Sequence, residues 1–280
     1  MSGPLDCPCD GANLEHAWTY TAPPEGETTF PALQGMPYTR HVRRCGICAH
    51  YVSEHGMDLG ALYGAEYMDA TYGDQGQRDS FERVTALPPE RSDNHGRVRR
   101  VVEYASTHGV LPSKASRRAR ALDVGSGLCV FLHRLAAEGF ECVALDPDPR
   151  AAQHARDVAG VAAVAGDFMD IDDLGRFDVV TLNKVLEHVA DPVAMLARTI
   201  RFVAPGGFVY LEVPDGPAAA TEGSGREEFF IEHLNVFSPA SLAMLVARSG
   251  LALAEMQRIR EPSTKYTLIA FCHPMDAGAR

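Results

Sequence analysis

The C-terminal part of the chain alternates short apolar runs with amphipathic segments, and this pattern begins at Arg118. Parallel strands need a crossover of a dozen or more residues, usually a helix, so an alternation at this spacing indicates right-handed βαβ units. The sequence therefore predicts an α/β fold with a doubly wound, mostly parallel, seven-stranded sheet. We expect strands at 121–124, 141–146, 161–166, 177–182, 208–213, 251–256 and 266–271, and helices at 128–138, 149–158, 192–203 and 238–249.

The chain divides into three segments by composition. Residues 1–80 are turn-rich, with a Pro-Pro pair, many glycines and only two β-like runs, at 30–33 and 39–43. Residues 81–116 are typical of a helical connector, and residues 117–280 carry the α/β pattern. A segment such as the first buries too little apolar surface to fold alone, so it needs a staple or a larger partner domain.

The net charge argues against some classes of function. Lys and Arg total 26 against 37 Asp and Glu, which gives −11 with histidine neutral. A negative surface repels phosphate backbones, so we expect no nucleic-acid partner. The first residues do not resemble a secretory signal, and no apolar run reaches the ~20 residues of a membrane span. We therefore expect a cytoplasmic protein without a membrane partner.

Four of the seven cysteines cluster near the N-terminus and suggest a metal site: Cys7, Cys9, Cys45 and Cys48. An odd total without a signal peptide argues against a disulfide framework. Cys45-x-x-Cys48 has the spacing that lets two thiolates reach one tetrahedral ion, whereas the Cys7-Pro-Cys9 pair is one residue shorter than usual. Histidines that could stand in as ligands are His41, His50 and His55. The alternative is four unbound thiols in a loosely ordered arm.

Glycines and acidic residues follow the first three predicted strands. Residues 123–127 (Asp-Val-Gly-Ser-Gly) form the first turn, Asp146 ends the second strand, and residues 166–168 (Gly-Asp-Phe) follow the third. Glycines permit a tight turn and let a ligand approach the backbone, while a helix N-terminus favours an anionic group. Asp146 lies nineteen residues after Gly127, where a ribose-binding carboxylate belongs. Together these residues predict a nucleotide-type site at one edge of the sheet.

Six segments together resemble the class I S-adenosylmethionine-dependent methyltransferases. They are LDVGSGLCVFLHRLA (122–136), VALDPDP (143–149), GDFMDI (166–171), LNKVLEHVADP (182–192), VAPGGFVYLEVP (203–214) and EHLNVFSPASLAMLVARSGL (232–251). The resemblance covers roughly residues 95–273, with Cys129 in place of the usual third glycine of the loop. It implies a Rossmann-like methyltransferase fold and S-adenosyl-L-methionine as the cofactor.

The same resemblance implies roles for individual residues. Asp123 and the 125–127 loop would lie against the methionine part of the cofactor, and Asp146 would accept hydrogen bonds from both ribose hydroxyls. Asp167 would bind the adenine amino group with Phe168 stacked beside it. The implied cofactor-binding residues are Asp123, Gly125, Ser126, Gly127, Asp146, Pro147, Asp167, Phe168 and Asn183.

The Cys-rich segment, the run ALYGAEYMDATYG (61–73) and the EHxNxFS motif are together similar to bacterial sugar C-methyltransferases and their shorter relatives. Those enzymes act on nucleotide-linked deoxysugars, and their N-terminal module binds a structural zinc ion. The resemblance therefore implies Zn2+ at the cysteine cluster and a small, sugar-type acceptor, either nucleotide-linked or part of a glycan or natural product. Longer members carry a further C-terminal domain, whereas this sequence ends soon after its last predicted strand, so C-methylation itself is kept as an alternative.

Residues 227–238 (EEFFIEHLNVFS) are the predicted place of acceptor chemistry. The Tyr-x-Glu-His run of the sugar enzymes becomes Phe230, Glu232 and His233 here, which favours transfer to oxygen over carbon. A histidine can remove a hydroxyl proton near neutral pH, and a neighbouring carboxylate can orient it. We predict His233 as the general base and Glu232 as its orienting group. The alternative is that His233 only holds the loop together.

Two other clusters of titratable residues near the predicted site are better explained by structural roles than by catalysis. Glu187 and His188 border the site, and we expect them to pack beneath the cofactor loop rather than to act as a base. A metal-assisted route would need an acidic cluster near the acceptor, and Asp170, Asp172 and Asp173 are better explained as a solvated loop. We therefore expect no catalytic metal.

Two further classes of function stay open. The chain could methylate RNA or protein with the Cys-rich segment as the reader, or keep the fold only as a binding or assembly subunit. The intact carboxylates Asp146 and Asp167 argue against the second class. Against the RNA alternative, the basic clusters of this chain lack interleaved aromatic residues, so we interpret them as solvated surface rather than a nucleic-acid site. The arginines concerned are Arg40, Arg43, Arg44, Arg97, Arg99, Arg100, Arg117, Arg118 and Arg120.

Overall fold

The computed structural model describes residues 7–9, 13–28, 30, 35, 37–56, 76–110 and 117–275. Its larger sheet has seven strands in the order β10-β11-β8-β7-β4-β5-β6. The strands from β4 to β8 pair in parallel, whereas β11 runs antiparallel to β8 and β10 antiparallel to β11. This confirms the predicted fold class. The strands are β4 (Arg120–Val124), β5 (Glu141–Asp146), β6 (Ala162–Ala165), β7 (Phe177–Asn183), β8 (Val203–Pro214), β10 (Leu251–Arg260) and β11 (Tyr266–Pro274).

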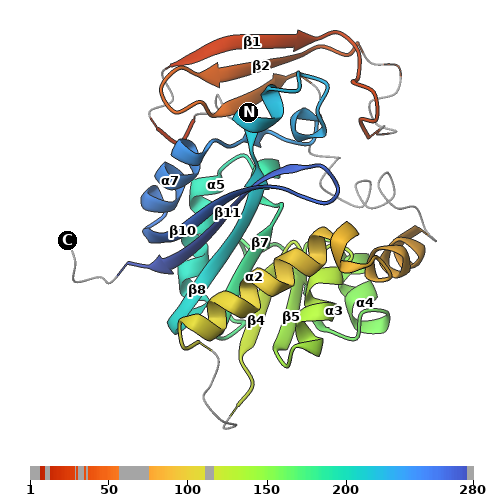
Figure 1. Ribbon diagram of the computed structural model, residues 1–280, viewed down its shortest axis with the longest axis vertical. Helices are drawn as coiled ribbons and strands as arrows, with labels where there is room; N and C mark the ends of the chain where they lie inside the picture. The colour runs from red at the N-terminus through yellow and green to blue at the C-terminus, as the bar shows by residue number, and fades with distance from the viewer. Residues whose placement is uncertain are drawn as a thin grey trace.

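Helices cover both faces of this sheet (Figure 1). Side chains of β8 alternate between the faces: Phe208 and Tyr210 join the core beneath α2, α3 and α4, while Val209 and Leu211 join the core beneath α5 and α7. This two-residue period is what a strand buried on both faces requires. The helices are one over 76–85, α2 (Asp93–Thr107), α3 (Val130–Ala137), α4 (Pro149–Asp157), α5 (Pro192–Arg198), α6 (Gly216–Ala220) and α7 (Pro239–Arg248).

Several helices start where the sequence supplies a cap. The side chains of Asp148, Asp191 and Ser238 accept backbone N–H groups at the starts of α4, α5 and α7, and each is followed by a proline. Such residues satisfy amides that have no partner in the helix, and proline in the first turn loses nothing. The predicted helix at 192–203 ends as α5 at Arg198, and a 3₁₀ turn (Thr199–Arg201) follows it. Among the described residues, no helix is long and apolar enough to cross a membrane.

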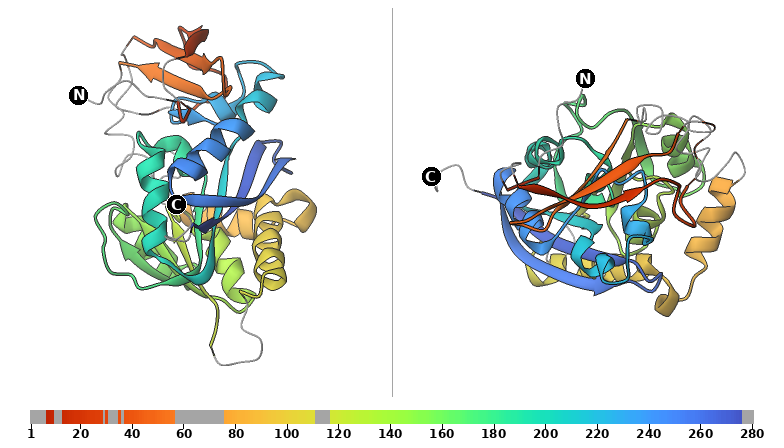
Figure 2. Two further views of the ribbon diagram at one scale, coloured as in Figure 1. Left: turned by 90° about the vertical axis from the view of Figure 1, so that its left-hand side faces the viewer. Right: turned by 90° about the horizontal axis from the view of Figure 1, so that it is seen from above.

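A second, antiparallel sheet lies beyond the carboxyl ends of the parallel strands, at the top of Figure 1 and in both views of Figure 2. Its order is β1-β2-β3-β9, with β1 (Leu14–Tyr20), β2 (Arg40–Cys45) and β3 (Tyr51–His55) from the N-terminal segment. The fourth strand, β9 (Asn235–Val236), comes from the segment predicted to carry acceptor chemistry.

The sequence identified only part of this sheet. The β-like run at 39–43 corresponds to β2, whereas β1 was not expected. Residues 31–33 of the other predicted run lie outside the described residues, as does the 61–73 run. The N-terminal segment thus completes its sheet with a strand that lies nearly two hundred residues further along the chain.

Candidate functional site

The turn from β4 into α3 has the geometry of a ligand-binding loop. Gly125 and Gly127 have φ of 71° and 50°, and Cys129 at the start of α3 has φ of 57°. These left-handed conformations favour glycine. A Cβ on Gly125 would lie 2.9 Å from Cγ2 of Val185, so the loop also passes too close to its neighbour for any side chain there.

Asp146 holds this loop in place from the end of β5. One carboxylate oxygen accepts the Gly127 N–H at 2.9 Å and the other accepts the Asp148 N–H at 3.0 Å. Burial raises the pKa of Asp146, and the two backbone donors oppose that rise. The structure therefore places Asp146 beside the glycine loop, as the sequence predicted.

Asp123 and Asn183 form the floor between β4 and β7. The Asp123 carboxylate is 3% exposed and accepts hydrogen bonds from Thr181 Oγ1 at 2.6 Å and Asn183 Nδ2 at 2.8 Å. Burial disfavours its charged form and raises its pKa to about 7. Thr181 was not singled out from the sequence, because a threonine inside an apolar strand carries no local signal.

Two buried polar atoms at this edge have no hydrogen-bond partner among the described residues: Ser126 Oγ and Asn183 Oδ1. An orphaned buried donor or acceptor costs about 1–3 kcal/mol unless a ligand or water satisfies it. Together with the narrow glycine turn and the Asp146 carboxylate, they form a donor and acceptor set suited to an amino-acid and ribose ligand. The residues present therefore fit an adenosyl cofactor.

The third acidic position differs in part from the expectation. Asp167 is exposed after β6 and accepts the Met169 N–H at 2.8 Å, and Pro147 is exposed beside Asp146. The ring of Phe168, however, is 3% exposed and lies 5.4 Å from the ring of Phe202 in the core. Phe168 thus presents almost no surface for the stacking that the resemblance implies, and Met169 is the exposed apolar residue at this point.

The predicted base lies in a small cluster of titratable groups. The rings of His188 and His233 are 4.9 Å apart, and one ligand atom each from Glu187, His188 and His233 lie within 4.8 Å of one another. This spacing could hold a metal ion. Glu187 and His188 were expected to pack beneath the cofactor loop. In the structure they lie beside His233 in the acceptor segment.

Hydrogen bonds fix the state of the two histidines. His233 Nδ1 lies 2.9 Å from the carbonyl oxygen of Glu228, and His188 Nδ1 lies 2.9 Å from that of Glu232. A carbonyl only accepts, so each Nδ1 carries the proton. Burial lowers the pKa of both rings, which keeps them neutral near pH 7. The partner of His233 is a backbone carbonyl, whereas the sequence predicted that the Glu232 carboxylate would orient it.

Glu187 is a buried carboxylate with no hydrogen-bond partner for either oxygen among the described residues. Burial raises its pKa to about 7, and the nearby Lys184 ammonium opposes that shift. Lys184 follows β7 with φ of 59° and donates a hydrogen bond from Nζ to Thr267 Oγ1 at 2.7 Å. A carboxyl poised near neutrality beside a neutral imidazole is typical of sites that move protons.

Arg97 and Arg100 correct the interpretation of the α2 arginines as solvated surface. Glu212 on β8 is fully buried and binds Arg97 at 2.6 Å and Arg100 at 3.1 Å, and it accepts the Tyr210 hydroxyl at 2.5 Å. The two cations lower the pKa of Glu212 to about 2 against the opposing effect of burial. Arg40 is likewise buried, in β2, and is not a surface residue. Arg99 is exposed as predicted.

The four N-terminal cysteines lie together. One sulfur from each lies within 4.8 Å of the others, with Cys7 and Cys9 sulfurs 2.8 Å apart, and none is in a disulfide. This cluster could hold a metal ion. The alternative histidine ligands have other partners: His41 bonds to Thr19, and His50 is buried against Ser241 and Asn235.

The acidic loop residue Asp172 is exposed and pairs with arginines, in agreement with a solvated loop.

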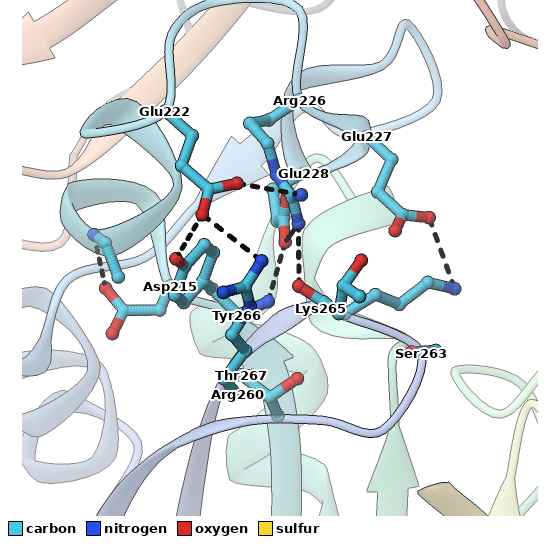
Figure 3. A network of polar contacts seen from close by, with 12 residues as sticks. Asp215, Glu222, Arg226, Glu227, Glu228, Arg260, Ser263, Lys265, Tyr266 and Thr267 are labelled. Atoms are coloured by element: carbon cyan, nitrogen blue, oxygen red, sulfur yellow. Dashed lines mark hydrogen bonds and ion pairs between the residues drawn. The ribbon is translucent and has the colours of Figure 1, made fainter. Parts of the chain in front are cut away.

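A polar network joins the start of the acceptor segment to the β10–β11 hairpin (Figure 3). Arg226 pairs with Glu228 at 2.8 Å and with Glu222 at 3.1 Å. The Glu228 carboxylate is buried and accepts the Tyr266 N–H at 2.7 Å. Glu228 therefore contacts the hairpin through its side chain and His233 through its carbonyl.

Comparison with known proteins identifies the family. A family model described as a methyltransferase domain matches residues 90–256. This chain belongs to that methyltransferase family. It is 30% identical over 171 residues to ubiquinone biosynthesis O-methyltransferase of Xanthomonas euvesicatoria, which is 55% of this chain and 70% of that protein. The protein of the same name from Xanthomonas campestris is 31% identical over 126 residues, 42% of this chain and 51% of that protein.

Solved methyltransferase structures share the fold. Magnesium protoporphyrin IX methyltransferase from Synechocystis superposes with a TM-score of 0.58 at 15% identity, over 78% of this chain and all of that one. The Burkholderia thailandensis 1,6-didemethyltoxoflavin-N1-methyltransferase gives 0.55 at 19% identity, over 90% of this chain and all of that one. Both were solved with S-adenosylhomocysteine bound. The family match and the O-methyltransferase relatives identify this chain as an S-adenosylmethionine-dependent methyltransferase, and the solved structures show that it shares their fold.

Proposed function

We propose that this methyltransferase transfers a methyl group to a hydroxyl of a small-molecule acceptor, and that the acceptor is a sugar. The observation that carries the proposal is the state of His233. Its Nδ1 proton is committed to the Glu228 carbonyl, so Nε2 keeps its lone pair, and Nε2 has no hydrogen-bond partner among the described residues. A neutral imidazole with one available lone pair is suited to accept a hydroxyl proton.

The mechanism follows from the arrangement of the residues. S-adenosyl-L-methionine, when bound, supplies a methyl group on a positively charged sulfonium that leaves as a neutral thioether. Asp146 and Asp123 position that ligand at the ends of β5 and β4, and Asn183 borders both the cofactor and acceptor sides. The chain must hold the acceptor oxygen about 3–3.5 Å from the methyl carbon and in line with the bond that breaks. His233 Nε2 takes the hydroxyl proton as the new bond forms.

The choice of acceptor rests on two kinds of support. The relatives in Xanthomonas are named O-methyltransferases, which supports transfer to oxygen. The EHxNxFS motif and the cysteine cluster are the features shared with sugar-modifying enzymes, and they support the sugar. The relatives are named for ubiquinone biosynthesis. This name supports the alternative that the acceptor is a hydroxyl on a small molecule other than a sugar.

We also propose a structural Zn2+ at Cys7, Cys9, Cys45 and Cys48. Four thiolates at the Zn–S distance of about 2.3 Å have sulfurs about 3.8 Å apart. The Cys9–Cys45 and Cys48–Cys7 distances are 3.4 and 3.8 Å, whereas the Cys7 and Cys9 sulfurs are 2.8 Å apart and would have to separate by about 1 Å to bind one ion. Such an ion would supply the staple that this small segment needs. We place the protein in the cytoplasm, where thiols stay reduced and available for a metal.

The test is methyl transfer from labelled S-adenosyl-L-methionine to a panel of nucleotide-sugars, with small phenols, total RNA and cell protein in parallel. The proposal predicts label in a nucleotide-sugar, and loss of that label in His233→Gln while S-adenosylhomocysteine still binds. Label in a phenol would keep the hydroxyl chemistry but discard the sugar. Label only in RNA or protein would overturn the proposal and make the cysteine segment the reader of the macromolecule.

A further inference from the structure

A buried ion pair lies in the N-terminal segment, close to the segment that carries His233. Arg40 on β2 and Glu27 are joined at 3.0 Å, and both side chains are 1% exposed. The Tyr38 hydroxyl donates to the second Glu27 oxygen at 2.6 Å, and the Arg40 guanidinium lies 4.1 Å from the centre of the Tyr20 ring. Burying two charges is costly, so such a pair is weak evidence for stability on its own.

Arg40 also donates to Tyr38 within the N-terminal segment, and both members of the pair bond to the acceptor segment. Arg40 Nη1 donates to the carbonyl of Phe229 at 2.6 Å, and Glu27 Oε1 accepts the N–H of Ile231 at 2.8 Å. These two backbone groups flank Phe230 and immediately precede Glu232 and His233. Arg40 thus holds the backbone at Phe229, and Glu27 holds it two residues later at Ile231.

The segment is bonded again on the other side of His233. The Ser53 N–H on β3 donates to the Leu234 carbonyl at 3.0 Å, and β9 then pairs with β3. The Glu228 carbonyl that accepts from His233 is held toward the hairpin through its own side chain (Figure 3). The backbone on both sides of the base is therefore set by contacts with residues distant in sequence.

We propose that Arg40 and Glu27 are positioning residues for methyl transfer, and that the N-terminal segment is thereby part of the acceptor site. They fix the backbone at Phe229 and Ile231, and that backbone keeps the His233 imidazole in hydrogen-bond register with the Glu228 carbonyl. The inference rests on the proposed role of His233 as the base. Neither side chain touches the cofactor residues at the ends of β4 and β5, so their effect should be confined to the acceptor side.

The test compares Arg40→Gln with a matched control on the same strand. Arg43 is on the same strand and pairs with Glu54 at 2.8 Å, but its side chain is 47% exposed. Arg43→Gln therefore removes an equivalent charge without the proposed role. Hydrogen exchange of the full-length protein should show at least tenfold faster exchange over 229–236 in Arg40→Gln. Residues 123–130 should exchange as in the wild type, and S-adenosylhomocysteine should bind within twofold. Arg43→Gln should match the wild type in all three measurements.

A second readout separates positioning from general support. Nitrogen NMR of the imidazole should show one Nδ1–H tautomer for His233 in the wild type and in Arg43→Gln, and a mixture of tautomers in Arg40→Gln. If Arg40→Gln does not fold, Glu27→Gln, which keeps the size of the side chain, should show the same changes to a smaller extent. Unchanged exchange and an unchanged tautomer in a folded variant would overturn the inference.

Activity distinguishes this inference from the proposed function. With any acceptor that the panel identifies, Arg40→Gln should lower the rate at saturating substrates at least tenfold, and Arg40→Lys should restore part of it. Retained turnover in His233→Gln would refute the base and leave the exchange result standing. Faster exchange in Arg40→Gln without a change in rate would refute the positioning role alone.

Discussion

Replacement of Glu212 by glutamine should destabilise the protein strongly, because it removes the buried carboxylate that binds two largely buried arginines on α2. Glu212 is fully buried and binds Arg97 and Arg100. Breaking a buried ion pair by removing one partner costs about 3–5 kcal/mol. The lowered pKa gives a similar figure: a carboxyl at about 2 in the folded protein, against 4.5 for the ordinary group, corresponds to about 3 kcal/mol.

The assay is urea unfolding at pH 7 and again near pH 3, with thermal unfolding in parallel. At pH 7 Glu212→Gln should lose about 3 kcal/mol in the free energy of unfolding, which corresponds to a melting temperature roughly 6–12 °C lower. The folded-state pKa is depressed, so this stabilisation is fully present above about 4.5 and is lost as pH falls toward about 2. The difference between variant and wild type should therefore shrink at pH 3.

The matched control is Glu103→Gln on the same helix. Glu103 pairs with Arg99 at 3.9 Å, and both side chains are about two-thirds or more exposed, so its loss should cost no more than about 0.5 kcal/mol. If Glu212→Gln were as mild as this control, or equally destabilising at both pH values, the buried ion network would not have the role assigned to it.

Three other substitutions test the site. Asp146→Ala should weaken S-adenosylhomocysteine binding at least about a hundredfold in a calorimetric titration, since two hydrogen bonds to a carboxylate are worth about 1.5–3 kcal/mol each. Unchanged affinity would remove the ribose assignment. Cys45→Ser should lower both zinc content and melting temperature, and a wild-type protein purified without metal would refute the zinc site. His233→Gln should lower turnover by about a hundredfold or more while cofactor affinity stays within twofold; if turnover persists, Glu187 becomes the next candidate base.

The sheet was predictable because its signals are local. Each parallel strand is a largely apolar run, and each carboxylate that we propose for the cofactor site stands at the end of its own strand. Asp123 and Asp146 could therefore be placed without any knowledge of distant contacts. The glycine turn is equally local, since Gly125 and Gly127 need left-handed backbone wherever they lie.

What the sequence did not reveal depends on contacts between distant residues. Arg97 and Glu212 are separated by more than a hundred positions, and an arginine beside other arginines has the same local pattern whether its helix face is solvated or buried. Glu212 was itself the available signal, because it is the one charged residue inside the apolar run at 208–213. The orienting group of His233 is a backbone carbonyl, which no side-chain motif can indicate.

The central claim is that the cofactor lies at the carboxyl ends of β4, β5 and β6 and that the acceptor segment lies beside it. Hydrogen exchange with and without S-adenosylhomocysteine tests it most directly. The account predicts ligand-dependent protection over 123–130, 144–148 and 166–169, with smaller changes over 183–188. Binding that protects other regions instead, or no binding at all, would contradict it.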